Sequence, residues 1–180
     1  MDQEKIIEQT KKWVADVVIG CNFCPFASKV VKENKVRYRV EKCETIAASL
    51  DILLEEYLTL DTDDDIETTM LILPETFHEF SFYLKLVQLV DKQLRKQQYE
   101  GVYQVASFHP DYCFAGEPAS DAANFTNRSP YPMLHIIRET SIDKALQHYP
   151  NPEGIPDRNM HFAREKGAAY MSMLREACLG

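Results

Sequence analysis

Between residues 36 and 108 the spacing of the hydrophobic residues alternates between two periods, and this alternation constrains the fold more than any other feature. The pattern predicts strands at 36–40, 69–73 and 102–108, and helices at about 43–58 and 77–98. The run at 69–73 is continuously apolar, which is typical of a central strand covered on both faces. The order β-α-β-α-β favours parallel strands joined by right-handed crossovers.

The remainder of the chain is mostly helical in pattern. We expect helices at about 3–19, 25–32, 130–139, 140–149 and 157–178, with an aperiodic segment at 109–129. The predicted fold class is therefore α/β, with a small mostly parallel or mixed sheet of three or more strands packed with helices in two or three layers. A ferredoxin-like arrangement is the alternative if one strand is missed. No linker is visible, so residues 1–180 are predicted to form one domain.

Charge and cysteine content narrow the class of protein. Lys and Arg total 20 against 28 Asp and Glu, which gives a net charge of −8 and disfavours binding to nucleic acid. No apolar run approaches the ~20 residues that a bilayer requires, so no membrane association is expected. The five cysteines are an odd number and the first residues lack a secretory pattern, so we expect a reduced, cytoplasmic protein.

Glycine spacing excludes three common sites. The six glycines are at least 13 positions apart, whereas phosphate loops, dinucleotide-binding turns and nucleophile elbows need glycines two to five positions apart. No cofactor is therefore predicted.

The aperiodic segment is the first candidate site. It follows a strand end, where ligands bind in open α/β sheets, and it is rich in hydrogen-bonding side chains. We expect a small polar or anionic molecule to be gripped by Arg128, with His135 and Arg138 on one face of the following helix. The full set of predicted binding residues is Asn22, Asn124, Thr126, Asn127, Arg128, Ser129, His135 and Arg138. The alternative is that these side chains only hold the loop together.

A cysteine near the start of a short helix is the second candidate. Cys24 precedes Pro25, and a thiol at a helix N-cap has a lowered pKa. With His109 as base and Asp111 orienting it, Cys24 would serve as a nucleophile. The alternatives are a buried structural cysteine, a redox pair with Cys21, or a metal site built from Cys21, Cys24, His109 and Cys113.

Several long motifs match a known family. The blocks are Asn22–Ala27, Ala106–Tyr112, Phe114–Gly116 and Asn124–Pro132. Together they resemble a bacterial family catalogued as domain of unknown function 1415, and the resemblance covers nearly the whole chain. It implies a soluble single-domain protein and no particular activity. Cys21 departs from the family pattern, which has an apolar residue there.

These observations lead to three functional hypotheses. The first is a hydrolase- or transferase-like enzyme that uses Cys24, His109 or both on a polar or anionic substrate. The second is a ligand- or protein-binding module without catalysis. The third is a structural metal-binding protein.

Overall fold

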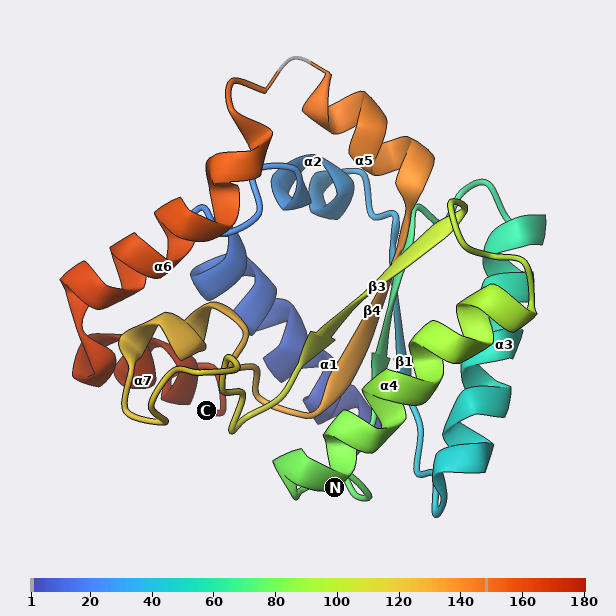
Figure 1. The fold of residues 1–180 in the computed structure, drawn as a ribbon, viewed down its shortest axis with the longest axis horizontal. Coiled ribbons are helices and arrows are strands. Elements are labelled where there is room, and N and C mark those ends of the chain that lie inside the picture. The colour runs from blue at the N-terminus through green and yellow to red at the C-terminus, as the bar shows by residue number, and fades with distance from the viewer. Residues whose placement is uncertain (1, 148) are drawn as a thin grey trace.

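The centre of the molecule is a four-stranded mixed sheet (Figure 1). The structure is a computed structural model that describes residues 2–147 and 149–180. The strands are β1 (Val36–Val40), β2 (Thr68–Ile72), β3 (Tyr103–Phe108) and β4 (Met133–Arg138). Their order in the sheet is β1-β2-β4-β3, with β1 parallel to β2 and β4 antiparallel to both of its neighbours. The three predicted strands therefore run in one direction, and a fourth lies between the second and the third.

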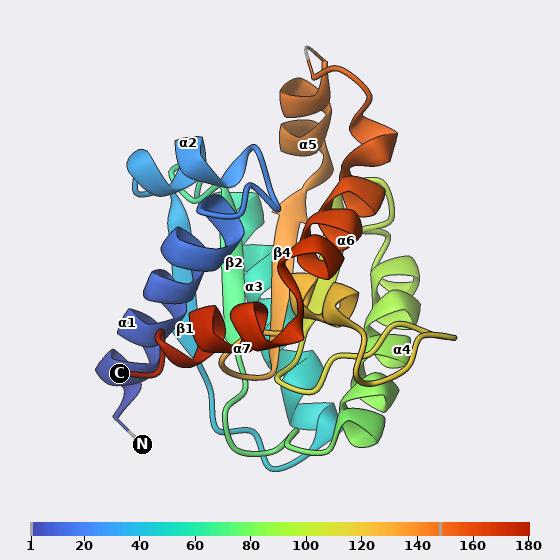
Figure 2. The same cartoon turned by 90° about the vertical axis from the view of Figure 1, so that its left-hand side faces the viewer.

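Helices cover both faces of this sheet, which gives the predicted α/β class in its three-layer form (Figures 1 and 2). The helical segments are α1 (Gln3–Trp13), the π-helix η1 (Val14–Ile19), α2 (Ala27–Lys32), α3 (Ile46–Thr62), α4 (Phe80–Lys96), the 3₁₀ helix η2 (Ala122–Thr126), α5 (Glu139–Leu146), η3 (Pro152–Gly154), α6 (Ile155–Lys166) and α7 (Ala168–Glu176). α3 and α4 lie on one face, and α1, α6 and α7 lie on the other. In the described part of the chain, no helix combines the length and apolarity that a membrane span needs.

Each face of the sheet has its own hydrophobic core. On the α3–α4 side, Leu71 and Leu134 pack against Leu53, Tyr83 and other buried residues. The opposite core is centred on other side chains, which include Trp13, Met70, Ile72, Phe125 and Met133. Side chains alternate across a strand, so neighbouring residues of β2 and β4 contribute to different cores. This explains why every residue of β2 is buried.

The segment predicted as a helix at 130–139 is instead the strand β4, and that prediction was wrong. We interpreted Pro130 and Pro132 as helix-initiating residues, but a proline also fits just before a strand. Residues 133–138 form a continuous ladder to β2 and to β3. This pairing places β4 in the interior of the sheet. The element order is β-α-β-α-β-β, which excludes the ferredoxin-like alternative.

The predicted start of the helix at 77–98 was also wrong. Thr76 and Glu79 have the spacing of a capping box, yet α4 begins at Phe80 and Glu79 makes no side-chain capping bond. Phe77 is fully buried in the α3–α4 core, and its carbonyl oxygen is bonded to the His109 ring. Burial of Phe77 therefore keeps this turn out of the helix.

The helix predicted at 157–178 is divided into α6 and α7 at Gly167. Gly167 has φ +83° and ψ 154°, a combination that essentially only glycine adopts. The break turns the chain so that α7 runs across the α1 side of the sheet (Figure 2). The position of α7 therefore depends on this one residue.

Replacing Gly167 with alanine is expected to lower the free energy of unfolding by about 1–3 kcal/mol, because an L side chain is strained at this φ and ψ. Urea unfolding followed by circular dichroism measures the effect. Gly180→Ala is the matched control, since Gly180 also has a positive φ of +81° but lies at an exposed chain end that can relax. Equal stability of the two variants would contradict this role for Gly167.

Candidate functional site

A cavity of 450 Å³ lies where the turn after η1, the end of β3, the 109–129 segment and α6 meet. We call it the Cys24 cavity. Its lining residues are Val18, Phe23, Cys24, Phe108, Phe114, Ala115, Glu117, Thr126, Asn127, Pro156, Asn159 and Met160. The structure thus brings Cys24 and the aperiodic segment together on one cavity, as the sequence led us to expect.

The wall of the Cys24 cavity is mostly apolar. Aromatic and aliphatic side chains from four separate segments form it, and Phe108 closes it at the end of β3. Among the described lining residues, Glu117 is the charged one, and its carboxylate lies 3.1 Å from the Arg164 guanidinium. No cationic side chain lines the cavity in the described part of the chain. Its lining therefore suits an uncharged ligand better than an anion.

Hydrogen bonds hold α6 against η2 and so fix the far wall of the cavity. Arg164 on α6 donates to both carboxylate oxygens of Asp121, the residue that caps η2. Hydrogen bonding to Arg164 lowers the pKa of Asp121 to about 2. Asp121 also accepts a hydrogen bond from the Ala123 amide at 2.8 Å. The pair therefore stays ionised at neutral pH and links the two segments.

Most polar groups of the wall are bonded to protein partners. Thr126 donates to the Ala123 carbonyl at 2.9 Å and to Asn127 Oδ1 at 3.0 Å. Asn127 Nδ2 donates to the Ser107 carbonyl at 3.2 Å, and Asn159 Nδ2 donates to the Phe23 carbonyl at 2.7 Å. These bonds use the groups that a polar ligand would need.

Cys24 differs from those groups. It is half-buried, forms no disulfide with another described cysteine, and its thiol makes no hydrogen bond with another residue that the structure describes. It does not cap a helix, because α2 begins at Ala27 with Phe26 at the N-cap. The predicted N-cap position of Cys24 was therefore wrong.

His109 is not placed to serve as the base for Cys24. The ring is completely buried, with ring centroids 5.1 Å from both Phe80 and Tyr83 of α4, and it does not line the cavity. Its Nε2 bonds the Phe77 carbonyl at 2.7 Å, and its Nδ1 accepts from the Asp111 amide at 2.9 Å. Burial lowers the pKa of His109, so the neutral ring joins the strand exit to the segment before α4.

Asp111 contributes its backbone rather than its carboxylate to this arrangement. The backbone amide of Asp111 orients the His109 ring, whereas Asp111 itself is an exposed residue. The predicted set of Cys24, His109 and Asp111 is thus not brought together by the structure.

Three other predicted binding residues support the loops around the cavity. Asn124 is completely buried; it accepts from the Phe114 amide at 2.9 Å and donates to the Pro118 carbonyl at 3.0 Å. Ser129 donates to a backbone carbonyl two residues ahead. Asn22 is exposed, has a left-handed backbone with φ +56°, and its carbonyl accepts from Arg158.

Arg128 also lies outside the cavity. Its Nε donates to the Tyr112 carbonyl at 3.0 Å and its Nη2 to the Ala119 carbonyl at 2.8 Å. Its guanidinium carbon lies 4.6 Å from the centre of the Phe125 ring. These contacts fold the 109–129 segment back on itself.

His135 and Arg138 do not share a face. Because β4 is a strand, residues three apart point to opposite sides of the sheet. His135 bonds the Thr68 hydroxyl at 2.7 Å on the α1 side. Arg138 lies on the α3 side, where it donates to the carbonyls of Leu60, Asp63 and Ile66 at the end of α3. The predicted anion grip with Arg128 is therefore absent.

The metal hypothesis finds no ligand set. In residues 2–147 and 149–180, no three His, Cys, Asp or Glu side chains come together as metal ligands would. The cysteines at 21, 24 and 113 are all free and half-buried, and burial raises the pKa of the Cys21 thiol.

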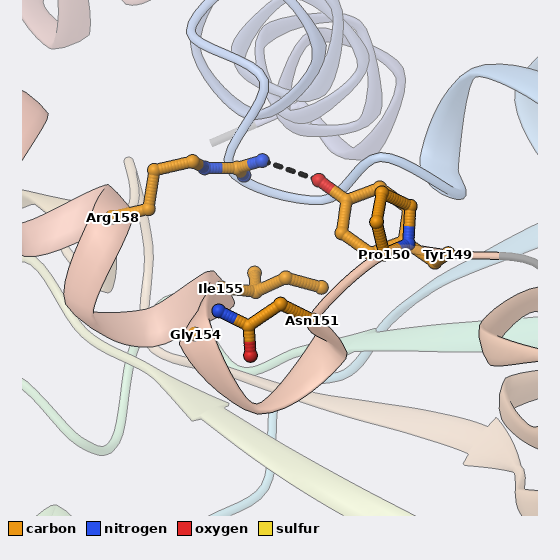
Figure 3. A pocket seen from close by; sticks show the side chains of 6 residues that line it. All are labelled: Tyr149, Pro150, Asn151, Gly154, Ile155 and Arg158. Carbon is orange, nitrogen blue, oxygen red and sulfur yellow. Dashed lines mark hydrogen bonds between the residues drawn. The ribbon is translucent and has the colours of Figure 1, made fainter.

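A second, smaller cavity of 220 Å³ lies at the start of α6 (Figure 3). Arg158 reaches across it and donates to the Tyr149 hydroxyl at 2.5 Å. The same guanidinium also bonds Asn22 and Asn159. Its donors are thus used in joining α6 to the turn that carries Cys24, which makes this a structural junction.

Sequence reasoning missed the contribution of α6 to the candidate site. Pro156, Asn159 and Met160 line the Cys24 cavity, but they lie far along the chain from its other walls. Their local pattern indicates only an amphipathic helix. No motif marks them.

Comparison with family models identifies the family of this chain. A family model described as a protein of unknown function, DUF1415, matches residues 5–173. No curated protein and no solved structure matches the chain.

The half-buried ring of His135 is expected to make stability depend on pH. Burial lowers its pKa from 6.5 to about 4, so below pH ~6.5 the unfolded chain binds a proton more readily than the folded one. The contribution of His135 to the free energy of unfolding is therefore present above pH ~6.5, and it is lost as the pH falls toward about 4. We expect wild type to lose up to about 3 kcal/mol more than His135→Gln across this range.

Urea unfolding of both proteins between pH about 7 and about 4.5 measures this difference. His161→Gln, which changes an exposed histidine of α6, is the control and should follow wild type. An identical pH dependence for wild type and His135→Gln would refute the assignment.

Proposed function

Because this chain belongs to the DUF1415 family of proteins of unknown function, we propose a role on the basis of its geometry: it binds a small, uncharged and largely apolar molecule in the Cys24 cavity. The observation that carries the proposal is the apolar lining of a 450 Å³ cavity built from four separate segments. Ligand sites typically measure about 300–1,000 Å³ and have mostly apolar walls with a few polar groups. We also propose that the protein is located in the cytoplasm.

The charge of the lining argues for an uncharged ligand. Burying an anion beside Glu117 would place two negative charges together in a medium of low polarity. Neither Arg128 nor Arg138, the arginines predicted to hold an anion, lines this cavity. The side-chain amides of Asn127 and Asn159 already donate to backbone carbonyls.

The proposal is tested with a neutral fluorescent probe, N-phenyl-1-naphthylamine. Wild type should bind it in a saturable manner, and Met160→Trp should abolish binding by filling the cavity. Met173→Trp is the matched control, because Met173 is 55% exposed on α7 and does not line the cavity. Binding that survives Met160→Trp in a folded protein, or is absent from wild type, would rule out this site.

A second candidate function is covalent chemistry at Cys24. It is favoured by one observation, a half-buried thiol on the cavity wall with no hydrogen-bonded partner among the described residues. No imidazole lines the cavity in that part of the chain, so a base would have to come from Glu117 or from the ligand.

The rate of alkylation by iodoacetamide separates the two functions. A binding protein should show slow labelling of Cys24 that rises with pH as for an ordinary thiol, whereas a nucleophile should react rapidly at pH about 6. Peptide mapping by mass spectrometry assigns the label. Cys113, whose thiol donates to the Glu117 carbonyl at 3.3 Å, is the internal control. Rapid labelling of Cys24 alone at pH about 6 would support catalysis.

A further inference from the structure

Two arginines from distant parts of the sequence share one aromatic ring. The guanidinium carbon of Arg128 lies 4.6 Å from the centre of the Phe125 ring, and that of Arg175 lies 5.9 Å from it. Arg128 follows η2, whereas Arg175 is in the last turn of α7. Both residues are half-buried. Packing of α7 against η2 thus places both positive charges beside the same aromatic ring.

Among the residues that the structure describes, both guanidinium groups are bonded only to neutral acceptors. Arg128 donates to the carbonyls of Tyr112 and Ala119, and Arg175 Nη1 donates to the Pro110 carbonyl at 2.7 Å. Arg175 Nε is buried and has no hydrogen-bond partner among the residues that the structure describes. A buried, unbonded donor on a charged group is costly, and an acceptor supplied from outside would remove that cost.

Neither arginine is neutralised by a carboxylate. In the described chain, Arg128 and Arg175 form no ion pair within 4.0 Å, whereas Arg39 and Arg164 each contact two or more carboxylates. Burial, followed by the nearby charge of Arg175, lowers the pKa of Arg128. Asp111 is the acidic residue whose charge acts in the opposite direction on Arg128, but its side chain is exposed and makes no ion pair there. No described carboxylate therefore lies close enough to form an ion pair with either arginine.

We propose that Arg128 and Arg175 form a binding site for a small oxyanion, a carboxylate or a phosphate group. Guanidinium groups bind such groups through paired, charge-assisted hydrogen bonds. The site is separate from the Cys24 cavity, because neither arginine lines that cavity, and it does not depend on the function proposed above. With a chain charge of −8, general attraction of anions is weak, so binding here depends on the local geometry.

The test is a titration with inorganic phosphate, and then with citrate and acetate, at an ionic strength held constant with sodium chloride. In ¹H–¹⁵N spectra of arginine side chains, the Nε–H signal of Arg175 should shift in a saturable manner. Arg175→Gln should weaken phosphate binding by at least about tenfold, measured by calorimetry. Arg95→Gln removes an exposed charge in the last turn of α4 and should leave binding unchanged. The three anions distinguish a phosphate site from a carboxylate site.

Two further outcomes keep the proposal falsifiable if Arg175→Gln does not fold. Asp111→Asn should tighten phosphate binding, because it removes a carboxylate whose negative charge acts on Arg128 and would repel the anion. The response of the Arg175 Nε–H signal of the wild type to the three anions also tests the proposal without any variant. If that signal does not respond to any of the three anions, or if Arg175→Gln folds and binds phosphate as well as wild type, the proposal is overturned.

Discussion

The pairing of β4 with both β2 and β3 is the constraint on which the rest of the structure depends. Phe108, the last residue of β3, is paired with Met133, the first residue of β4. The whole segment between them must therefore leave and re-enter the sheet at one edge, and it folds into a compact cap there. That cap, with η2 inside it, meets α6 and the turn after η1. The Cys24 cavity is a consequence of this closure.

Polar side chains in the cap mainly organise the cap. Asn124 bonds two backbone groups on its own loop, and His109 joins β3 to the segment before α4. A loop this long has many backbone groups without ladder partners, and each buried one needs a bond. A high density of hydrogen-bonding residues therefore indicates a loop that is internally bonded as readily as it indicates a binding site. Arg175, which reaches the cap from α7, differs from them, because its Nε finds no acceptor in the described chain.

The sequence predicts the layered α/β class and three of the strands, because burial on one face leaves alternation in β1 and burial on both faces leaves an apolar run in β2. β4 was misassigned because residues 133–138 are short, apolar and preceded by prolines, a pattern that a helix and an interior strand share. Pairing of distant segments decides between them, and local spacing carries no record of that pairing. The same limit applies to the candidate sites, because residues brought together by packing carry no local signal. Cys24 and Asn127 belong to recognisable sequence motifs, whereas Met160 and Arg175 look like ordinary helix residues.

The π-helical segment η1 has a consequence for how this family can vary in length. Its wide turns give bonds such as Gly20 N–H to the Ala15 carbonyl and Phe23 N–H to the Val18 carbonyl, and a wide turn of this kind holds one more residue than an α-turn. Loss of a single residue there would restore ordinary α-helical turns, and the following chain would rotate by about 100°. Cys24 would then face away from the cap. Single-residue deletions in residues 14–19 should accordingly be selected against wherever the cavity is used.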